Sequence, residues 1–312
     1  MPQHLLILAP LPSFLIEPLR ACYECHEYHA AADKAALLDE CGPLIRGVVG
    51  AGGTHYSEAV LQHLPHLEII AVFGVGYDGV PLDYCRSRGI QVTNTPDVLT
   101  DDVADIAVAL VLMTSRKLVA ANRFLHEGTW QQGQFELATA LRGKKAGIFG
   151  LGRIGKAIAH RLEAFGMKIA YHGRKAQAVP YEFFGSLADL AREVDFLIVA
   201  CPGGADTRQI INSTILSALG SDGTLINIAR GSIVDEAALI VALKNGTIKA
   251  AGLDVFENEP HVPAELVELD NAALLPHVGS GTRETRGGMA DLVVQNLAAH
   301  FSGQPLVTPV TL

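Results

Sequence analysis

One glycine motif constrains this chain more than any other feature. It reads Gly150-Leu151-Gly152-Arg153-Ile154-Gly155, between the apolar segment Lys145 to Phe149 and a helical pattern over Lys156 to Phe165. In a strand-turn-helix unit, the first glycine permits a tight turn, the second lets the backbone approach a pyrophosphate, and the third permits close helix–strand packing. The first N–H groups of the helix then bind phosphate. We therefore predict a dinucleotide site; a glycine turn without nucleotide is the alternative, which the context disfavours.

The motif lies within a regular alternation of strands and helices. Strands are predicted at 146–149, 168–172, 195–200, 224–229, 250–254 and 272–276. Helical patterns separate them, and the clearest runs from Asp235 to Lys244, with a capping Asp at its start and a stop at Gly246. This alternation predicts a doubly wound parallel sheet of the α/β class.

The rest of the chain predicts a second domain with the same rhythm. Its expected elements are strands at His4–Ala9, Arg46–Gly50 and Glu68–Val72, a helix ending near Ala21, and a last helix over about Arg283–Phe301. A long helix from Thr100 or Asp101 to about Gly128 is expected where the dinucleotide domain begins. A length of 312 residues suits two domains. We predict two Rossmann-like doubly wound parallel-sheet domains with an interdomain cleft: a dinucleotide-binding domain at 98–283, and a substrate-binding domain formed by 1–97 with 284–312.

Charge and composition exclude several classes of function. The chain carries 24 basic and 33 acidic residues, a net charge of −9, so we expect no binding to nucleic acid or to an anionic membrane. The longest apolar stretch, Ile106 to Met113, is too short to cross a bilayer. The N-terminus lacks a basic signal region, and the five cysteines are an odd number. These features predict reduced thiols and a cytoplasmic location, with no metal site.

Three polar segments follow successive strands of the predicted sheet. They are Asn227-Ile228-Ala229-Arg230-Gly231, Asp254-Val255-Phe256-Glu257-Asn258-Glu259-Pro260 and Pro276-His277-Val278-Gly279-Ser280. Ligands of open α/β sheets bind at the carboxyl ends of strands, so Arg230, Glu259 and His277 are expected to reach one cleft. Each residue alone is commonly structural or solvated. Together they supply an anion clamp, a carboxylate and a titratable imidazole, which the reduction of a 2-keto acid requires.

The residues after the second strand of the dinucleotide domain predict which cofactor binds. An NAD site places Asp or Glu there, about 20 residues past the glycine motif, on the ribose 2′-hydroxyl. This chain reads His172-Gly173-Arg174-Lys175, with no acidic residue from Met167 to Val179. Arg174 can bind a 2′-phosphate through its guanidinium, and Lys175 adds a second positive charge. We therefore predict that NADPH is preferred over NADH; two solvated residues on an ordinary turn are the alternative.

Taken together, these motifs resemble those of the D-isomer-specific 2-hydroxyacid dehydrogenases over essentially the whole chain. The resemblance also covers Phe73-Gly74-Val75-Gly76-Tyr77-Asp78 and Asn94-Thr95-Pro96-Asp97-Val98-Leu99-Thr100, and it is strongest to the glyoxylate/hydroxypyruvate reductase branch. It implies that Arg230, Glu259 and His277 are catalytic, with His277 donating the proton. It also implies that the backbone at Val75 and Gly76 holds the substrate carboxylate, and that Asp254 faces the nicotinamide amide.

The resemblance further implies a set of cofactor contacts and a homodimer formed through the cofactor domain. The cofactor contacts would be Gly150, Gly152, Arg153, Ile154, Gly155, His172, Gly173, Arg174, Lys175, Cys201, Pro202, Thr207, Ile228, Ala229, Arg230, Asp254, His277 and Gly279. Cys201 would line the adenosine side and is not expected to act as a nucleophile. Trp130 has two interpretations: it lies at the dimer interface, or it packs within its own loop and stabilises that loop.

Other functions remain open at this point. A reductase for a larger 2-keto acid, such as phenylpyruvate or 2-ketogluconate, has the same motifs. NAD(H)-sensing corepressors, which bind without turnover, share the fold. The segment Cys22-Tyr23-Glu24-Cys25-His26, with His29 nearby, also fits a haem-attachment or metal pattern. It falls where the first domain needs its second strand, so we interpret it as a chance pattern on a strand.

Overall fold

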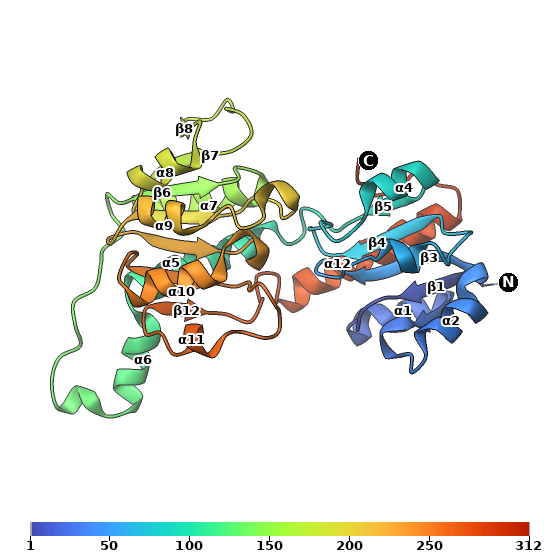
Figure 1. Ribbon diagram of the computed structural model, residues 1–312, viewed down its shortest axis with the longest axis horizontal. Helices are drawn as coiled ribbons and strands as arrows, with labels where there is room; N and C mark the ends of the chain where they lie inside the picture. Colours follow the sequence, from blue (N-terminus) through green and yellow to red (C-terminus); the bar gives the residue numbers. More distant parts are fainter. Residues whose placement is uncertain (1, 312) are drawn as a thin grey trace. The chain divides into compact units, whose positions relative to one another are not determined.

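Two parallel β-sheets organise the chain in a computed structural model that describes residues 2–311 (Figure 1). One sheet has five strands and the other has seven. The chain divides into two compact units, the first formed by 1–99 with 282–312 and the second by 100–281. The fold is therefore of the predicted α/β class, and each unit is described by itself below.

The first unit is a five-stranded parallel sheet in the order β2-β1-β3-β4-β5. Its strands are β1 (His4–Ile7), β2 (Glu24–Glu27), β3 (Ile45–Ala51), β4 (Ile69–Phe73) and β5 (Gln91–Thr93). Its helices are α1 (Ser13–Cys22), α2 (Lys34–Cys41), α3 (Glu58–Leu61), α4 (Leu82–Arg88) and α12 (Arg283–Phe301). Apolar residues of the central strands, such as Leu6, Val48 and Ile70, are fully buried under these helices. In the haem-like segment, Cys22 ends α1, and Glu24, Cys25 and His26 lie in the edge strand β2, as the strand interpretation requires for that part.

The second unit is a seven-stranded parallel sheet in the order β12-β11-β10-β9-β6-β7-β8. Its strands are β6 (Lys145–Phe149), β7 (Lys168–His172), β8 (Glu182–Phe184), β9 (Phe196–Val199), β10 (Thr224–Asn227), β11 (Ala250–Leu253) and β12 (Ala272–Leu274). Its helices are α5 (Thr100–Ser115), α6 (Leu118–His126), α7 (Arg153–Ala164), α8 (Leu187–Glu193), α9 (Ser213–Leu219), α10 (Glu236–Lys244) and α11 (Ala264–Val267). The strand order reverses direction between β6 and β9, and the glycine motif follows β6. Ligands of doubly wound sheets bind at this switch point.

The long helix predicted from Thr100 to about Gly128 is wrong as a single element. The chain forms α5 and α6 instead, and Lys117 between them has a φ of 51°. The hydroxyl of Thr114 donates to the carbonyl of Leu110 at 2.8 Å, and the Ser115 carbonyl accepts the N–H of Thr139 at 2.9 Å. The Thr114 bond competes with the regular backbone hydrogen bonds at the end of a helix. The bond from Thr139 comes from a segment distant in sequence, so a local pattern does not reveal it. The edge strand β8 was also not predicted, because it has three largely exposed residues.

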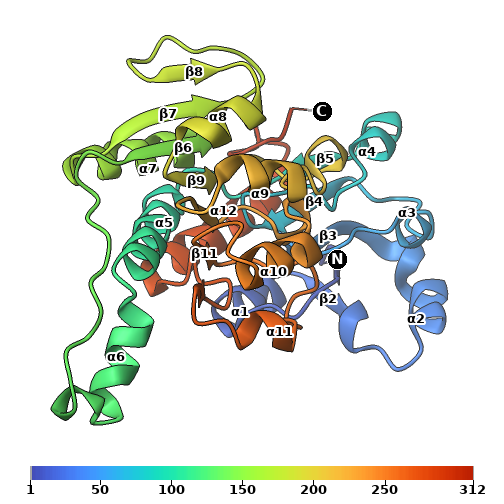
Figure 2. The same ribbon diagram turned by 60° about the vertical axis from the view of Figure 1, so that its left-hand side comes forward.

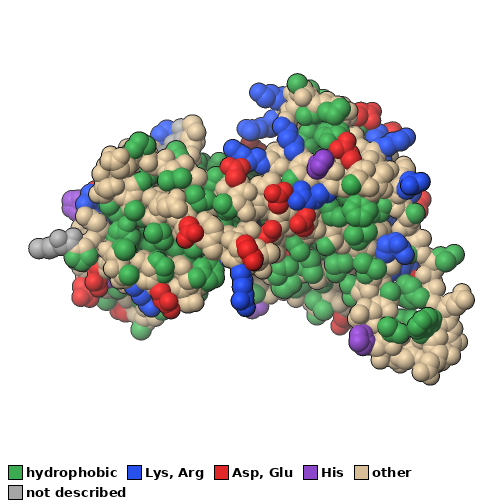
Figure 3. Space-filling view, turned by 180° about the vertical axis from the view of Figure 1, so that it is seen from behind, with side chains coloured by type: hydrophobic (Ala, Val, Ile, Leu, Met, Phe, Trp, Pro, Cys, Tyr) green, Lys and Arg blue, Asp and Glu red, His purple; other side chains and the backbone are tan. Residues whose placement is uncertain are grey.

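The segment after α5 forms an arm that projects from the second unit (Figures 1 and 2). It comprises α6, the short helix Thr129–Gln131 and an irregular stretch that returns to β6. Apolar side chains are exposed along it, including Trp130 at 65% and Leu137 at 96%. Figure 3 shows apolar surface over this arm at the lower right of the view. Within residues 2–311, no helix combines the length and apolarity needed to span a membrane.

Candidate active site

The three expected catalytic residues follow neighbouring strands of the second sheet. Arg230 follows β10, Glu259 follows β11, and His277 follows β12. Those strands are parallel and adjacent, so their carboxyl ends lie side by side. The topology therefore brings a cation, a carboxylate and an imidazole to one edge of one sheet.

Glu259 and His277 form a direct hydrogen-bonded pair. His277 Nδ1 lies 2.7 Å from Glu259 Oε2, and Glu259 Oε1 accepts the backbone N–H of Phe256 at 3.0 Å. Burial raises the pKa of the Glu259 carboxyl. The hydrogen bond and charge of His277 lower it more, and the Phe256 N–H and the Arg230 charge add to that lowering, so the pKa lies below its usual value. The Glu259 carboxylate therefore orients the ring through Nδ1. The His277 side chain is 44% exposed, and Nε2 is the nitrogen available to a ligand.

Asp254 fixes the backbone that carries His277. It is 1% exposed, and its two oxygens accept the N–H groups of Val278 and Gly279, each at 2.7 Å. Burial raises the pKa of the Asp254 carboxyl, although these N–H groups oppose the rise. His277 itself has a φ of 52°, a left-handed conformation that the surrounding structure must enforce. Sequence reasoning missed this structural role, because three carboxylates lie between 254 and 259 and spacing does not show which one turns inward.

Buried polar contacts also position Arg230. Asn227 Nδ2 donates to the Arg230 carbonyl at 2.8 Å, and Asn227 Oδ1 accepts the N–H of Ala229 at 3.0 Å. A side chain at Gly231 would place its Cβ 1.9 Å from the backbone of Phe256, so only glycine lets these two strand ends approach. Asn227 was also missed as a positioning residue; an Asn that ends a buried strand is a signal for such local bonds.

The glycine motif has the geometry that a dinucleotide requires. Gly150 has a φ of 102°, and a Cβ there would lie 2.6 Å from the backbone of Cys201. Helix α7 begins at Arg153, followed by Ile154. Gly155 packs against the Gly150 carbonyl. At Gly152, no atom of the described chain apart from its two sequence neighbours lies within 4 Å of a Cβ position, which leaves space for a phosphate before the helix. These residues fit a nicotinamide dinucleotide.

The residues around the motif occupy the ends of β7, β9 and β10. His172 ends β7, and its Nδ1 lies 2.8 Å from the Phe184 carbonyl; Gly173, Arg174 and Lys175 follow in an exposed turn. Cys201 is buried, which raises the pKa of its thiol to about 12 and leaves it unsuited to nucleophilic chemistry. The remaining predicted contacts Pro202, Thr207, Ile228 and Ala229 line the loops after β9 and β10. The Thr207 hydroxyl donates to the Pro202 carbonyl at 2.9 Å, which orders the first of these loops.

In the first unit, the predicted carboxylate-binding loop follows β4. Asn94 Nδ2 donates to the Val75 carbonyl at 2.8 Å, and the Thr95 N–H donates to the Gly74 carbonyl at 2.9 Å. Within residues 2–311, the N–H groups of Val75 and Gly76 have no hydrogen-bond acceptor. Asn94 is nine-tenths buried and was missed by sequence reasoning as the residue that holds this loop.

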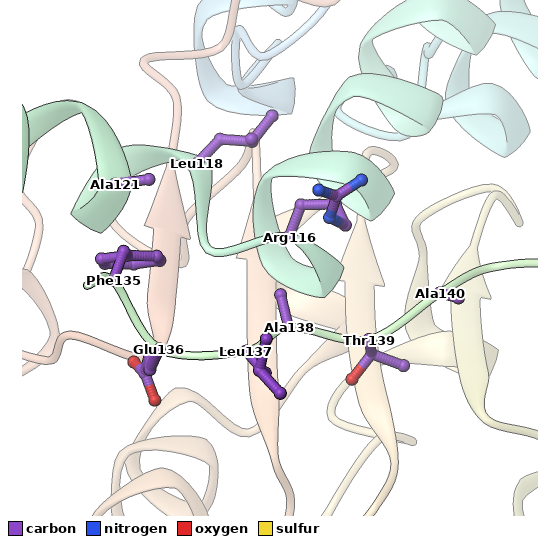
Figure 4. Close-up of a pocket in the computed structure, with 9 residues that line it drawn as sticks. All are labelled: Arg116, Leu118, Ala121, Phe135, Glu136, Leu137, Ala138, Thr139 and Ala140. Atoms are coloured by element: carbon purple, nitrogen blue, oxygen red, sulfur yellow. The ribbon is translucent and has the colours of Figure 1, made fainter.

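A hollow on the arm is separate from these residues. A pocket of about 390 Å³ lies between the end of α5, the start of α6 and the returning stretch of the arm, and Figure 4 shows the residues that line it. It is lined by Arg116, Leu118, Ala121, Phe135, Glu136, Leu137, Ala138, Thr139 and Ala140. In the described part of the chain, no cluster of three or more His, Cys, Asp or Glu side chains could hold a metal ion.

A glycine loop at the switch point, with a hydrogen-bonded Glu–His pair at neighbouring strand ends, is the arrangement of a dinucleotide-dependent oxidoreductase. The chain belongs to the D-isomer-specific 2-hydroxyacid dehydrogenases: the family model for their NAD-binding domain matches residues 108–279. The family resemblance inferred from the motifs is thereby confirmed.

Individual relatives cover nearly the whole chain. Glyoxylate/hydroxypyruvate reductase A of Arabidopsis thaliana is 48% identical, and hydroxyphenylpyruvate reductase of Plectranthus scutellarioides is 47% identical; each match covers 98% of both chains. An NADPH-dependent glyoxylate/hydroxypyruvate reductase of Sinorhizobium meliloti, solved with NADP and malonate, is 46% identical with a TM-score of 0.92. That match covers 100% of this chain and 97% of the other.

Proposed function

We propose that this protein catalyses the NADPH-dependent reduction of glyoxylate or hydroxypyruvate to glycolate or D-glycerate. The observation that carries this proposal is the hydrogen-bonded pair of His277 and Glu259 beside Arg230, on the same sheet edge as an open glycine loop. The reductases of Arabidopsis thaliana and Sinorhizobium meliloti support the choice of substrate and cofactor. The relative that acts on hydroxyphenylpyruvate supports a larger 2-keto acid as the second candidate.

Each residue has a distinct role in the proposed reaction. The glycine loop and the turn at Arg174 hold the dinucleotide, which when bound supplies a hydride to the carbonyl carbon of the substrate. Arg230 binds the substrate carboxylate and polarises the keto oxygen. His277 donates its Nε2 proton to that oxygen, which becomes the hydroxyl group.

Two further assignments belong to the same proposal. The N–H groups of Val75 and Gly76 hold the substrate carboxylate, since the contact from Asn94 orients their loop and both groups have an open hydrogen-bonding position within the described chain. Asp254 faces the nicotinamide amide in addition to anchoring Val278 and Gly279. Each carboxylate oxygen has a second acceptor position for such a contact.

The substrate proposal is tested by a panel of 2-keto acids assayed with NADPH. We expect the highest kcat/KM with glyoxylate or hydroxypyruvate. Higher efficiency with phenylpyruvate, hydroxyphenylpyruvate or 2-ketogluconate would instead identify a reductase for larger acids. Cofactor binding without turnover on any acid would favour a corepressor-like protein.

Replacing Glu259 with glutamine should move the pH profile of ketone reduction to lower pH. The Glu259 carboxylate and the protonated His277 ring stabilise each other, which is part of why the pKa of Glu259 lies below its usual value. A neutral amide removes this stabilisation of the acid form, so kcat/KM should fall more at pH 8 than at pH 6. Steady-state profiles of both forms measure the shift.

The matched control for this experiment is Glu257→Gln. Glu257 lies in the same loop, but its carboxylate faces Arg208 at 3.3 Å rather than the imidazole. Its profile should coincide with that of the unmodified protein. A Glu259→Gln profile that also coincides would mean that Glu259 is not the functional partner of His277.

We also propose that the protein is a homodimer formed through the arm of the cofactor-binding unit. Leu118, Val119, Leu125, Trp130 and Leu137 expose apolar side chains along this arm, and contiguous exposed apolar surface marks an interface. Sedimentation velocity should give twice the 33.1 kDa mass of one chain. Leu137→Asp should shift the protein towards the monomer, whereas Leu44→Asp, at an exposed leucine outside the arm, should not. A monomeric unmodified protein would reject the proposal.

A cytoplasmic location remains a proposal. All five cysteines are free thiols, and Cys41, Cys85 and Cys201 are buried. Reduced thiols are typical of the cytosol. Fractionation of cells that express the protein at its native level tests the location.

A further inference from the structure

Gln177 joins the basic turn to the glycine loop. Its side-chain Nε2 donates to the carbonyl of Leu151 at 2.9 Å, and Leu151 lies between Gly150 and Gly152. The basic turn, His172 to Lys175, ends only two residues earlier. This single amide therefore connects the backbone proposed to bind the pyrophosphate with the backbone proposed to present the 2′-phosphate ligands.

The backbone of Gln177 also forms a hydrogen bond with β7. Tyr171, on β7, is 1% exposed, and its hydroxyl oxygen accepts the Gln177 N–H at 2.7 Å. Beyond Gln177, the Tyr181 hydroxyl donates to Glu163 of α7 at 3.1 Å. At the start of the turn, the Gly150 N–H donates to the His172 carbonyl at 2.9 Å. The segment from 172 to 181 is thus attached to the glycine loop, to β7 and to α7.

The two basic side chains have no comparable attachment of their own. Arg174 and Lys175 are exposed, and neither forms a hydrogen bond or ion pair with residues 2–311. Long flexible side chains lose rotamer freedom when they bind a ligand, so a fixed backbone lowers the remaining cost of binding. The contacts of Gln177 consequently fix the backbone that carries the positive charges of Arg174 and Lys175.

We propose that Gln177 is a positioning residue for cofactor specificity, which holds Arg174 and Lys175 at the 2′-phosphate of NADPH. This inference rests on the NADPH preference proposed above. NADH has no 2′-phosphate for the turn to contact. Loss of the Gln177 amide should therefore weaken binding of NADPH and leave binding of NADH nearly unchanged.

The first test replaces Gln177 with methionine, which keeps the length of the side chain and removes the amide. We expect the KM for NADPH to rise about two- to tenfold, the effect of one hydrogen bond, with kcat at saturating NADPH unchanged. The KM for NADH should change less than about twofold, within the range of a surface substitution. Gln62→Met, at an exposed glutamine after α3, is the matched control and should alter neither KM.

A double-mutant cycle separates this inference from the proposed cofactor preference. In an Arg174→Ala/Lys175→Ala background, Gln177→Met should add no further change to the KM for NADPH, because the groups that it positions are gone. An undiminished effect in that background, an equal rise for both cofactors, or no effect of Gln177→Met alone would overturn the inference only. An Arg174→Ala/Lys175→Ala protein with an unaltered KM for NADPH would overturn both the inference and the proposed preference.

Tyr171→Phe provides an independent second variant. It removes the hydroxyl that accepts the Gln177 N–H and keeps the buried ring. It should also raise the KM for NADPH selectively, and thermal unfolding of each variant reports whether the fold is retained. A folded Tyr171→Phe protein with both KM values unchanged would contradict a backbone held through Gln177.

Discussion

Replacing His277 with alanine should lower kcat for keto-acid reduction about 10²- to 10⁴-fold, the usual contribution of a general acid. His277 is bound to Glu259 at Nδ1, and its half-exposed ring leaves Nε2 to donate a proton to the substrate oxygen. Alanine has no proton to donate, so the developing alkoxide must take one from water. The measurement is kcat at saturating keto acid and NADPH, together with the Kd for NADPH from fluorescence titration.

The Kd is essential to this experiment, because a loss of activity alone would not distinguish the acid from a disturbed fold. Half of the proposed cofactor contacts, nine of eighteen, lie in the glycine loop and the basic turn, which this substitution leaves intact, so NADPH binding should survive. His66→Ala, at an exposed histidine after α3, is the matched control and should keep full activity. Turnover of His277→Ala near that of the unmodified protein would exclude His277 as the acid.

The sequence predicted those parts of the fold that depend on local pattern. Apolar strand segments bounded by glycine or proline gave β6, β7 and β9 to within a residue or two. The capped helix α10 begins after Asp235, whose side chain accepts the N–H of Ala238, as the capping pattern indicates. The predicted strands after β9 continue one or two residues too far at their carboxyl ends, because those last residues already belong to the site loops.

Features that depend on contacts between distant segments could not be predicted in the same way. The break after Ser115 involves a backbone contact from Thr139, and the anchoring of the His277 loop involves the buried carboxylate of Asp254. The role of Gln177 could not be predicted either, because the sequence of a polar turn does not show that one of its side-chain amides binds the Leu151 carbonyl. Sequence motifs indicated which residues carry the proposed chemistry, whereas the residues that hold them in place emerge only from the folded chain.

The second large effect should concern the cofactor: kcat/KM should be higher with NADPH than with NADH, and Arg174→Ala should reverse much of that difference. The turn at His172 to Lys175 is attached to the glycine loop through the Gly150 N–H, which donates to the His172 carbonyl at 2.9 Å. No carboxylate occurs from 167 to 179 to repel a 2′-phosphate. A hydrogen bond to a charged group contributes about 1.5–3 kcal/mol, so kcat/KM for NADPH should fall about 10- to 100-fold.

The control and the salt dependence make this prediction specific. Arg192→Ala removes the same charge from α8, where Arg192 pairs with Asp189, and should leave the ratio of the two efficiencies unchanged. The KM for NADPH should rise with ionic strength more steeply than that for NADH, because exposed charges at the 2′-phosphate are screened by salt. Equal or better efficiency with NADH in the unmodified protein, or an Arg174→Ala variant that keeps its KM for NADPH, would reject the preference. In that case Arg174 and Lys175 would be solvated residues on an ordinary turn, and the missing acidic residue would carry no information about the cofactor.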